Sequence, residues 1–411
     1  MLNSLHLAAC ILHNSLLSHI RKQTLQRFFI WRLGDVLLAS LEALFMQITL
    51  LRTMDKIMKE IPVIIFGIGG VGRTLIQQII ASRSAIANSN SVTFKIVALI
   101  DSRQWLFVPK GISDSDLTAA VERKAAGNPL GGSERPSAEN LMSTIVETGI
   151  KNAIVLDVTA VEGMEPAIDL ALASGYGIAL ANKKPHAGLW EQAQKYYQNP
   201  AVRHESTVGG GEPIIATLRY LSDINDTFYS CEGQLSGTLG FMCRELEKGR
   251  PFSEALAEAK GLGYTEPDPR DDLSGEDVMR KVLIMGRMAG WHLEQSDFEV
   301  ESLYDADMAD CSVAEFVERS AQMDAKLAKR FADAKAAGKV LRYIGRVTEN
   351  GGKVGLMELD ANSPMANLKY IQFHTDLYDA EPLMIIGAGA GLEMTAGGVL
   401  GDMISLAREV L

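Results

Sequence analysis

Residues 62–72 read PVIIFGIGGVG, a run of five mainly apolar residues followed by the pattern G-x-G-x-x-G. The apolar run predicts a buried strand, and residues 75–81 have the spacing of a helix. In such a turn Gly67 allows a sharp change of direction, Gly69 lets the backbone approach a pyrophosphate, and Gly72 lets helix and strand pack closely. A tight turn that needs small residues only for packing is the alternative, but the order of strand, glycines and helix favours a dinucleotide site. The predicted cofactor-binding residues of this turn are Gly67, Gly69, Gly70, Val71 and Gly72.

The second strand-like run, residues 95–100, ends at Asp101. This acid lies farther from the glycines than the roughly 20 residues usual for a ribose-binding acid, so a longer helix and loop must lie between them. An acid at this place hydrogen-bonds a ribose 2′-hydroxyl and repels a 2′-phosphate, which favours NAD. Arg103 can offset that repulsion and admit NADP. Both cofactors therefore stay open, with Asp101 and Arg103 as candidate binding residues.

Strand-like and helical stretches alternate through the first half of the chain. Further strand-like runs cover residues 153–158, 177–181 and 202–206, and the polar segment 110–140 predicts a surface helix between loops. Strands separated by helices predict βαβ units and a parallel sheet with helices on both faces. The expected fold class is α/β, a Rossmann-type doubly wound parallel sheet.

After Gly209 the pattern changes to a mixture of both element types, which predicts an α+β second domain. Its catalytic and dimerisation roles are what the resemblance described below implies. The expected helices cover residues 214–221, 252–260 and 323–337, and the expected strands cover residues 300–303, 340–347, 353–359 and 369–378. The predicted divisions of the chain are an N-terminal extension 1–60, a dinucleotide-binding domain 61–208, a substrate and dimerisation domain 209–384, and a C-terminal segment 385–411 that returns to the nucleotide domain.

The composition of the 411 residues narrows the classes of partner. A net charge of −11 gives no basic footprint for nucleic acid and argues against anionic membranes. No window has the roughly 18 uninterrupted apolar residues of a transmembrane helix. The four cysteines are scattered without a CxxC pair, which predicts free thiols in a reducing compartment.

Residues 1–53 differ from the remainder because they carry five basic and two acidic residues, a net charge of +3. Interleaved apolar and basic residues with few acids are typical of an organelle transit peptide. An upstream extension without function, with the start at Met54 or Met58, is an equal alternative, and an amphipathic helix that docks on the body is a weaker one. The expected location is the cytoplasm, or the plastid stroma if residues 1–53 are a transit peptide.

Residues 263–281, GYTEPDPRDDLSGEDVMRK, concentrate charge around two prolines. Each proline fixes φ and biases the preceding residue away from the helix, which predicts a stiff, extended segment. Asp277 and Lys281 are four residues apart and should share one face of a helix that starts near Ser274. A solvated charged loop is the alternative. The extended segment is expected to hold Glu266, Asp268, Arg270, Asp271 and Asp272.

Three further motifs follow predicted strands. Lys183, in the sequence ANKKP, is expected at the carboxyl end of a strand, where ligands bind in open α/β sheets, although a solvated lysine is the alternative. Residues 205–213, ESTVGGGEP, contain three glycines that permit unusual backbone angles and turn carbonyls inward. Residues 236–239, SGTL, can bring backbone amides to a ligand or form a plain turn.

Together these motifs resemble the homoserine dehydrogenase family, over residues 61–411. The matching stretches are GIGGVG, ANKKP, ESTVGGGEP, SGTLG, GYTEPDPRDDLSGEDVMRK and the closing GAGAG with Thr395 and Ala396. The resemblance is to the short monofunctional type without an aspartokinase. Because the chain ends soon after GAGAG, we expect no C-terminal regulatory domain.

The resemblance implies the NAD(P)H-dependent reduction of L-aspartate 4-semialdehyde to L-homoserine, a step toward threonine, methionine and isoleucine, by a homodimer. It implies that Lys183 and Lys281 flank the reacting oxygen. Asp277, one turn before Lys281, should favour the charged ammonium. The implied substrate-binding residues are Glu266, Asp272, Asp277, Tyr264, Gly237 and Thr238. The further implied cofactor-binding residues are Asn182, Gly387 and Gly389, and a monovalent cation, Na⁺ or K⁺, is implied at Glu205 and the carbonyls of Val208, Gly210 and Glu212.

Two other readings compete with this one. Another NAD(P)-dependent oxidoreductase of a small amino-acid or semialdehyde substrate is the first, but an acyl-enzyme mechanism needs a reactive cysteine, and Cys231, Cys243 and Cys311 lie in no setting typical of one. A non-catalytic nucleotide-binding regulatory protein is the second. A retired site has no reason to keep Lys183 and Lys281, because charges are costly to bury.

Overall fold

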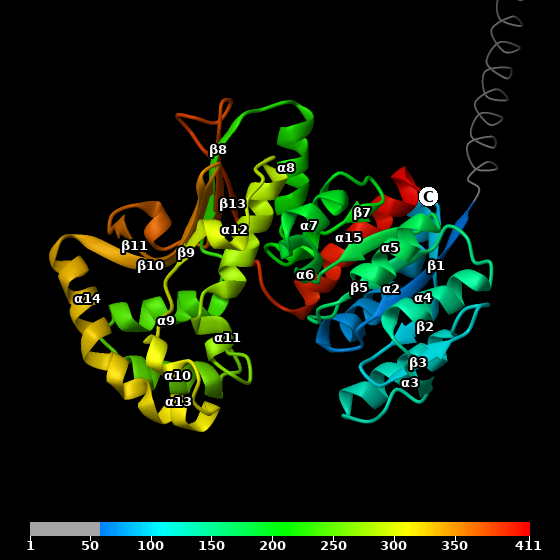
Figure 1. Cartoon of the computed structure of the whole chain (residues 1–411), viewed down its shortest axis with the longest axis horizontal. Helices are drawn as coiled ribbons and strands as arrows, with labels where there is room; N and C mark the ends of the chain where they lie inside the picture. Colours follow the sequence, from blue (N-terminus) through cyan, green and yellow to red (C-terminus); the bar gives the residue numbers. More distant parts are fainter. Residues whose placement is uncertain (1–57) are drawn as a thin grey trace, which may run out of the picture. The chain divides into compact units, whose positions relative to one another are not determined.

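The computed structural model describes residues 58–411, and Lys59–Leu411 form one compact unit (Figure 1). The predictions for residues 1–53 concern positions outside this range. Within it the chain builds two β-sheets, one from each half of the sequence. The expected domain bounds at residues 60, 208 and 384 remain a prediction. No helix in the described range is long and apolar enough to cross a membrane.

The first sheet has the strand order β4-β3-β2-β1-β5-β6-β7. Its central strand β1 pairs in parallel with β2 and β5, and the parallel pairing continues from β5 through β6 to β7. The strands are β1 (Lys59–Phe66), β2 (Val92–Ile100), β3 (Gln104–Phe107), β4 (Ser133–Glu134), β5 (Ile154–Asp157), β6 (Gly177–Leu180) and β7 (Val202–Arg203).

Helices cover both faces of this sheet, and they are α2 (Gly70–Asn90), α3 (Asp114–Ala125), α4 (Ala138–Glu147), α5 (Glu165–Ala173) and α15 (Leu392–Glu409) (Figure 1). In β1, Val63 and Ile65 pack with α2, α3 and α15, whereas Ile64 and Phe66 pack with α4 and α5. Successive side chains of a strand point to opposite faces, so an uninterrupted apolar strand is buried on both. The doubly wound, Rossmann-type arrangement predicted from the sequence is confirmed.

The edges of this sheet differ from the prediction. β3 runs antiparallel to β2, and β4 antiparallel to β3, so the sheet is not parallel throughout. The chain reverses after β2 because Oδ1 of Asp101 accepts the amide N–H groups of Arg103 and Gln104. At the opposite edge, the strand expected over residues 202–206 ends at Arg203, because Glu205–Thr207 form a short 3-10 helix, η1.

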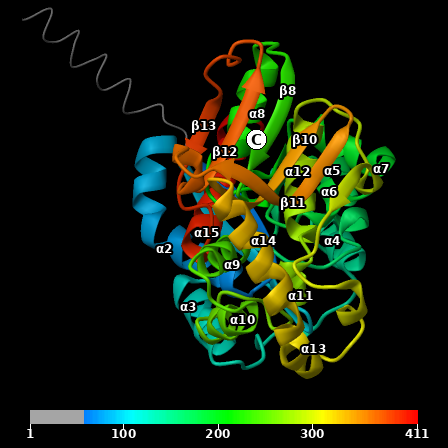
Figure 2. The same ribbon diagram turned by 90° about the vertical axis from the view of Figure 1, so that its left-hand side faces the viewer.

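The second sheet is mostly antiparallel and has the order β13-β12-β8-β10-β11-β9. Figure 2 shows its long strands β8, β10, β11 and β12 side by side. The strands are β8 (Phe228–Gly233), β9 (Phe298–Val300), β10 (Lys339–Thr348), β11 (Gly351–Asp360), β12 (Tyr370–Thr375) and β13 (Leu383–Ile386). The helices of this half are α8 (Ile214–Asp223), α9 (Gly237–Glu247), α10 (Phe252–Gly261), α11 (Arg270–Leu273), α12 (Glu276–Met288), α13 (Val313–Arg319) and α14 (Asp324–Ala336).

Two local predictions in this half are wrong. Arg270, Asp271 and Asp272 do not lie in an extended segment, because Pro269 has helical angles and α11 begins directly after it, at Arg270. The strand expected over residues 300–303 lies earlier, as β9, which ends at Val300. The helix predicted to start near Ser274 is α12, which follows Gly275.

Candidate active site

The glycine turn between β1 and α2 fits a pyrophosphate by its packing. A Cβ atom on Gly72 would lie 1.9 Å from the carbonyl oxygen of Gly67, and Gly67 itself has a φ of +104°. Both positions therefore require glycine for the turn itself. A Cβ on Gly69 would meet nothing within 4 Å, so this side of the turn is open where α2 begins. The open backbone at a helix N-terminus suits an anionic group.

Asp101, at the end of β2, has both carboxylate oxygens engaged within the protein. Oδ1 accepts the amides of Arg103 and Gln104 at 2.7 and 2.6 Å, and Oδ2 forms an ion pair of 2.8 Å with Lys124. Burial acts to raise the pKa of Asp101, but Lys124 and the turn amides outweigh it and hold the pKa below its usual value. The sequence did not point to Lys124, which comes from α3.

Asn182 is buried at the carboxyl end of β6, and its side chain is also engaged. Its amide donates to Asp157 at 2.9 Å and to the carbonyl of Val161 at 2.8 Å, and its side-chain oxygen accepts the backbone N–H of Lys184 at 3.1 Å. The amide thus orders the turn that precedes α6 (Lys184–Ala187). A role in cofactor binding stays a prediction.

Two lysines from distant segments meet at one carboxylate. Lys183 precedes α6, and its Nζ lies 3.3 Å from Oδ1 of Asp277. Lys281 lies one turn after Asp277 on α12, and its Nζ lies 2.7 Å from Oδ2 of Asp277 and donates to the carbonyl of Leu235 at 2.7 Å. The structure therefore brings together Lys183 and Lys281, which the resemblance implied on either side of the reacting oxygen, and Asp277, which was predicted next to Lys281.

The charges of this cluster shift one another's protonation. Burial acts to raise the pKa of Asp277, but Lys281 and Lys183 outweigh it and hold the pKa well below the usual value. Burial is also the main cause that lowers the pKa of Lys183, with Asp277 opposing and Lys281 adding to the decrease. Lys183 therefore releases its proton more readily than a solvated lysine.

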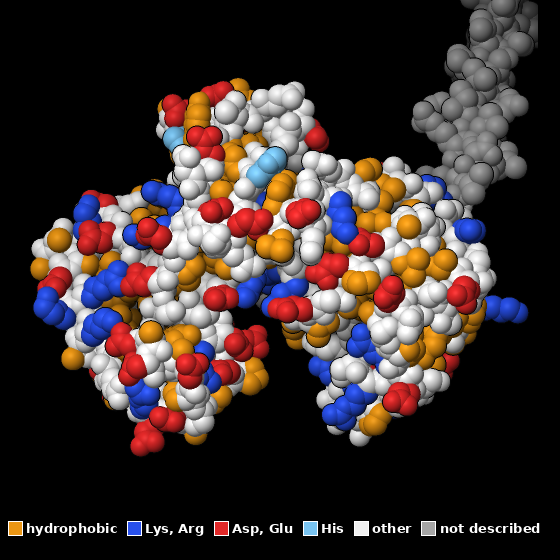
Figure 3. Space-filling view, in the orientation of Figure 1, with side chains coloured by type: hydrophobic (Ala, Val, Ile, Leu, Met, Phe, Trp, Pro, Cys, Tyr) orange, Lys and Arg blue, Asp and Glu red, His pale blue; other side chains and the backbone are white. Residues whose placement is uncertain are grey.

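Two neighbouring cavities meet at this cluster. The first, with a volume of about 770 Å³, is lined by Lys281 and the second, of about 730 Å³, by Lys183. Three acids line both cavities: Glu266, Asp272 and Asp277. Figure 3 shows a deep indentation in one face of the molecule with acidic and basic side chains gathered along it. The two ammonium groups thus contact the shared carboxylate where the two cavities adjoin.

The acids between the cavities are partly bonded to neighbouring groups. Asp272 accepts the backbone N–H of Glu266 at 2.8 Å and lies 3.1 Å from the hydroxyl of Thr238. Burial raises the pKa of Asp272, and the nearby charges of Glu266 and Asp277 add to the increase. Repulsion among acids of this kind is relieved by a bound cation, so the cluster suits an ammonium group.

The other predicted pocket residues lie on the same cavity as Lys281. Gly237 is the first residue of α9 and Thr238 the second, and the hydroxyl of Thr238 donates to the carbonyl of Tyr264 at 2.6 Å. The half-exposed ring of Tyr264 packs edge-on against Phe241. The sequence did not point to three further polar residues that line this cavity, Gln234, Arg244 and Lys369, because nothing in their local sequence marks them.

The glycine-rich loop 205–213 offers oxygen atoms, some of which already have partners. The carboxylate of Glu205 accepts the N–H groups of Ile215 and Ala216 at 2.8 and 2.9 Å, at the start of α8. The carbonyl of Glu212 accepts the N–H of Ile214 at 2.8 Å. Two of the four predicted cation ligands, Glu205 and Glu212, thus accept hydrogen bonds from the start of α8. The other two predicted ligands are the carbonyls of Val208 and Gly210.

Gly387 and Gly389 surround the side chain of Glu212. A Cβ on either glycine would lie 2.8 or 2.3 Å from a carboxylate oxygen of Glu212. Both glycines line the cavity of Lys281. Glycine is required at both positions because the closing GAGAG run passes close to Glu212. The contact of these two residues with the cofactor remains a prediction.

Two of the three cysteines in the described range are unsuited to covalent catalysis. Cys231 and Cys243 are buried free thiols, and burial raises the pKa of both well above the ordinary value. A nucleophilic cysteine needs a lowered pKa.

Comparisons with known proteins point to one family. Residues 213–404 match the family model described as homoserine dehydrogenase. The chain is 35% identical over 373 residues to a homoserine dehydrogenase of Paracoccidioides brasiliensis, covering 84% of this chain and 97% of that protein. It is 36% identical over 357 residues to the bifunctional aspartokinase/homoserine dehydrogenase of Haemophilus influenzae, covering 84% of this chain but 43% of that protein. The chain thus spans less than half the length of the bifunctional relatives that it matches.

Solved structures show the same fold over most of the chain. A Candida auris protein of unknown function has a TM-score of 0.74 at 33% identity, covering 86% of this chain and 99% of that one. A hyperthermophilic archaeal homoserine dehydrogenase, solved in complex with NADPH, has a TM-score of 0.63 at 20% identity, covering 85% of this chain and 98% of that one. At that identity the likeness extends to the fold alone.

Proposed function

Because the chain belongs to the homoserine dehydrogenase family, whose members are NAD(P)-dependent oxidoreductases, we propose that it reduces L-aspartate 4-semialdehyde to L-homoserine. The observation that carries the proposal is the cluster of Lys183, Asp277 and Lys281, where two ammonium groups meet beside cavities lined by acids. A small substrate with an ammonium group and an aldehyde matches both features.

The chemistry follows from the charges at this cluster. When bound, the nicotinamide supplies the hydride. Negative charge then grows on the aldehyde oxygen, and a lysine ammonium beside it stabilises that charge and donates the proton. Lys183 is suited to donate because its pKa is lowered by burial. Asp277 holds the two lysines close together before the substrate oxygen arrives, while Glu266 and Asp272 bind the substrate ammonium.

We infer that NADPH is the preferred cofactor. The glycine turn at residues 67–72 fits the pyrophosphate, because Gly69 leaves open backbone there. The acid that would repel a 2′-phosphate, Asp101, is already paired with Lys124, and the exposed side chain of Arg103 lies next to it. A higher kcat/KM for NADH than for NADPH would contradict this inference.

A monovalent cation, a homodimer and a cytoplasmic location complete the proposal. Glu205 with the carbonyls of Val208, Gly210 and Glu212 supplies only oxygen atoms, which suit a hard cation such as Na⁺ or K⁺. Activity in buffers of Na⁺, K⁺ or tetramethylammonium tests the cation, and light scattering tests the dimer. The fluorescence of tagged chains that start at Met1 or at Met54 tests the cytoplasmic location against the plastid.

The direct test is a steady-state assay of the purified chain. We expect NAD(P)H to be oxidised with aspartate semialdehyde and homoserine to appear as product. Turnover only with other semialdehydes would favour a different oxidoreductase. Cofactor binding without turnover of any aldehyde would favour a non-catalytic regulatory protein.

A further inference from the structure

Arg287 is a buried cation near the carboxyl end of α12, the helix whose first turns carry Asp277 and Lys281. At 1.5 Å per residue, Arg287 lies on the order of 15 Å along the helix from Asp277. The sequence contains one sign of it, an arginine within the otherwise apolar run VLIMGRM at residues 282–288.

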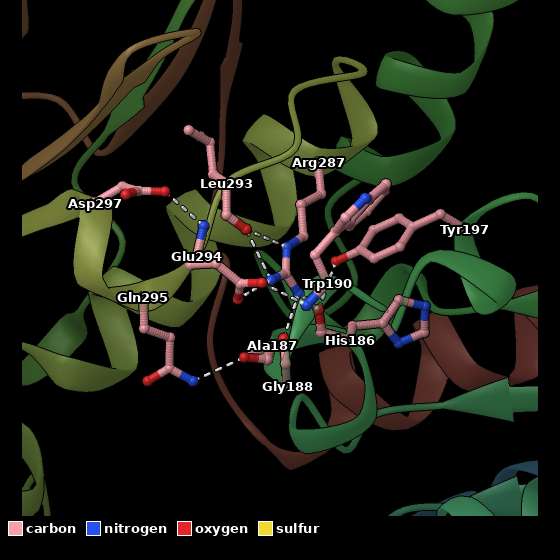
Figure 4. A network of polar contacts seen from close by, with 10 residues as sticks. All are labelled: His186, Ala187, Gly188, Trp190, Tyr197, Arg287, Leu293, Glu294, Gln295 and Asp297. Atoms are coloured by element: carbon pink, nitrogen blue, oxygen red, sulfur yellow. Dashed lines mark hydrogen bonds and ion pairs between the residues drawn. The ribbon is translucent and has the colours of Figure 1, made fainter. Parts of the chain in front are cut away.

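All five N–H donors of the Arg287 guanidinium have acceptors (Figure 4). Nη1 donates to the carbonyls of His186 and Gly188 at 2.6 and 2.8 Å. Nε and Nη2 donate to the carbonyl of Leu293 at 2.9 and 2.8 Å, and Nη2 pairs with Glu294 at 3.2 Å. The guanidinium is therefore hydrogen-bonded to two segments that are about a hundred residues apart in the sequence.

The segment after Arg287 binds the same loop at two more places. Glu294 accepts the backbone N–H of Trp190 at 2.9 Å, and the side chain of Gln295 donates to the carbonyl of Ala187 at 2.7 Å (Figure 4). Four backbone groups of residues 186–190 are thus held by side chains from residues 287–295. This segment, called loop 186–190 below, runs from the last residues of α6 to the first residue of α7 (Trp190–Tyr197).

This loop is joined to Lys183 by a single helical turn. Lys183 precedes α6, and its carbonyl accepts the N–H of Ala187 at 2.8 Å. At the other end of α12, the side chain of Lys183 meets Asp277. The region around α6 is therefore attached to α12 at two points, one through Arg287 and one through the catalytic cluster.

A buried guanidinium is costly to desolvate even when fully bonded, so its stability contribution alone does not explain it. Buried ions are best attested where they select one arrangement of neighbouring elements. Here the arrangement that the bonds of Arg287 select is the one in which Lys183 lies against Asp277 and near Lys281.

We propose that Arg287 is a positioning residue for the reaction: by holding loop 186–190 against α12, it places Lys183 beside Asp277 so that both lysines reach the same substrate oxygen. Gln295, which is exposed, holds the same loop through its hydrogen bond to the carbonyl of Ala187. The inference deepens the proposed function and rests on the assignment of Lys183 to the proton transfer.

The test compares Arg287→Met, Arg287→Lys and Gln295→Leu with a matched control, Arg342→Met. Arg342 is equally buried and donates to the carbonyls of Ala366 and Leu341 at 2.6 and 2.8 Å, but its partners all lie in the second half of the chain. Gln295 is exposed, so its substitution does not threaten folding.

We expect Arg287→Met to lower kcat by about 10- to 100-fold, since small misplacements of a reacting group have effects of this size, while the KM for NADPH changes little. Arg287→Lys should restore part of kcat, and Gln295→Leu should lower kcat several-fold without a change in melting temperature. Arg342→Met should lower the melting temperature but not kcat.

A second readout does not depend on turnover. The pH dependence of acetylation of Lys183 by acetic anhydride, followed by mass spectrometry, reports the pKa of Lys183. In Arg287→Met this pKa should rise toward the ordinary lysine value, because Lys183 leaves its half-buried place among Asp277, Lys281 and Arg280. The control should keep the pKa of the unaltered protein.

Equal losses of kcat in Arg287→Met and Arg342→Met would overturn the proposal. The proposal would also be overturned if Arg287→Lys and Gln295→Leu both kept the kcat and the pKa of Lys183 of the unaltered protein. If the unaltered protein reduced no aspartate semialdehyde, the proposed function would fail, and the acetylation comparison would still decide whether Arg287 positions Lys183.

Discussion

The ammonium groups of Lys183 and Lys281 lie on the two oxygens of one carboxylate, that of Asp277, at 3.3 and 2.7 Å. Two cations this close would repel each other without the anion between them. The carboxylate therefore holds two ammonium groups from distant parts of the sequence in one cluster. A developing alkoxide would meet two donors whose placement is already fixed, which is the condition for electrostatic stabilisation of a transition state.

Replacing Lys281 should affect the chemical step rather than cofactor binding. We expect Lys281→Ala to lower kcat about 10²- to 10⁴-fold, the usual range for loss of a positioned proton-transfer group. The KM for NADPH should change little. Lys326→Ala, which removes an exposed lysine paired with Asp305, is the control and should keep full activity. Normal turnover of the Lys281 variant would remove this residue from the chemistry.

Replacing Asp277 should change the pH dependence of the reverse reaction. Oxidation of homoserine requires a deprotonated lysine, so its rate rises with pH through the pKa of that lysine. Asp277 raises the pKa of Lys183, whereas burial and Lys281 lower it. In Asp277→Asn the pKa of Lys183 should fall further, and the rise of kcat/KM should occur at lower pH than in the unaltered protein. A shift to higher pH would show that Lys183 does not accept this proton.

Two glycines of the nucleotide turn should respond differently to alanine. In Gly69→Ala the new Cβ meets nothing within 4 Å, so the melting temperature should be unchanged while the KM for NADPH increases. In Gly72→Ala the Cβ would lie 1.9 Å from the carbonyl of Gly67, so the melting temperature itself should fall. Thermal denaturation with and without NADPH separates the two effects. Cofactor affinity that survives Gly69→Ala would place the pyrophosphate elsewhere.

The elements that local pattern could predict are those with strong periodicity. The apolar runs of β1 and β5 and the helical spacing of α14 specify their elements within the segment itself. The antiparallel edge strands β3 and β4 could not be predicted in this way, because they have four and two residues and depend on pairing with β2. The prolines near residue 268 predict an extended segment, but the fixed φ of proline also fits a helix, and Pro269 has helical angles directly before α11.

The candidate site shows the same limit. Asp277 and Lys281 could be paired from their spacing, because residues four apart on a helix are neighbours. The family resemblance implied that Lys183 and Lys281 lie near each other, but the contact of Lys183 with Asp277 was not predicted. The partners of Asp101 and Arg287 were not foreseen, since Lys124 and the carbonyls of loop 186–190 reach them only through tertiary packing.

A buried carboxyl away from the catalytic cluster should make stability depend on pH. Asp402 on α15 accepts the backbone N–H of Glu205 at 2.8 Å, and Arg203 and Arg219 are also nearby. Burial, with the nearby charge of Glu205, raises the pKa of Asp402 to about 8, although both arginines oppose the increase. The folded protein therefore binds a proton there that the unfolded chain has released above its pKa of about 3.9.

The resulting contribution to stability is fully present below the unfolded pKa and is lost as the pH rises through the folded pKa. Between the unfolded and the folded pKa, each rise of one pH unit lowers the free energy of unfolding by at most about 1.4 kcal/mol through this group.

Asp402→Asn removes the titration but keeps an oxygen that can accept the N–H of Glu205. Urea denaturation between about pH 5 and 8 should therefore give a flatter dependence for Asp402→Asn than for the unaltered protein. Glu409→Gln is the matched control, because Arg203 helps to hold the pKa of Glu409 below its usual value and this group has finished titrating in that range. Parallel curves for the unaltered protein and Asp402→Asn would mean that Asp402 is ionised throughout the range.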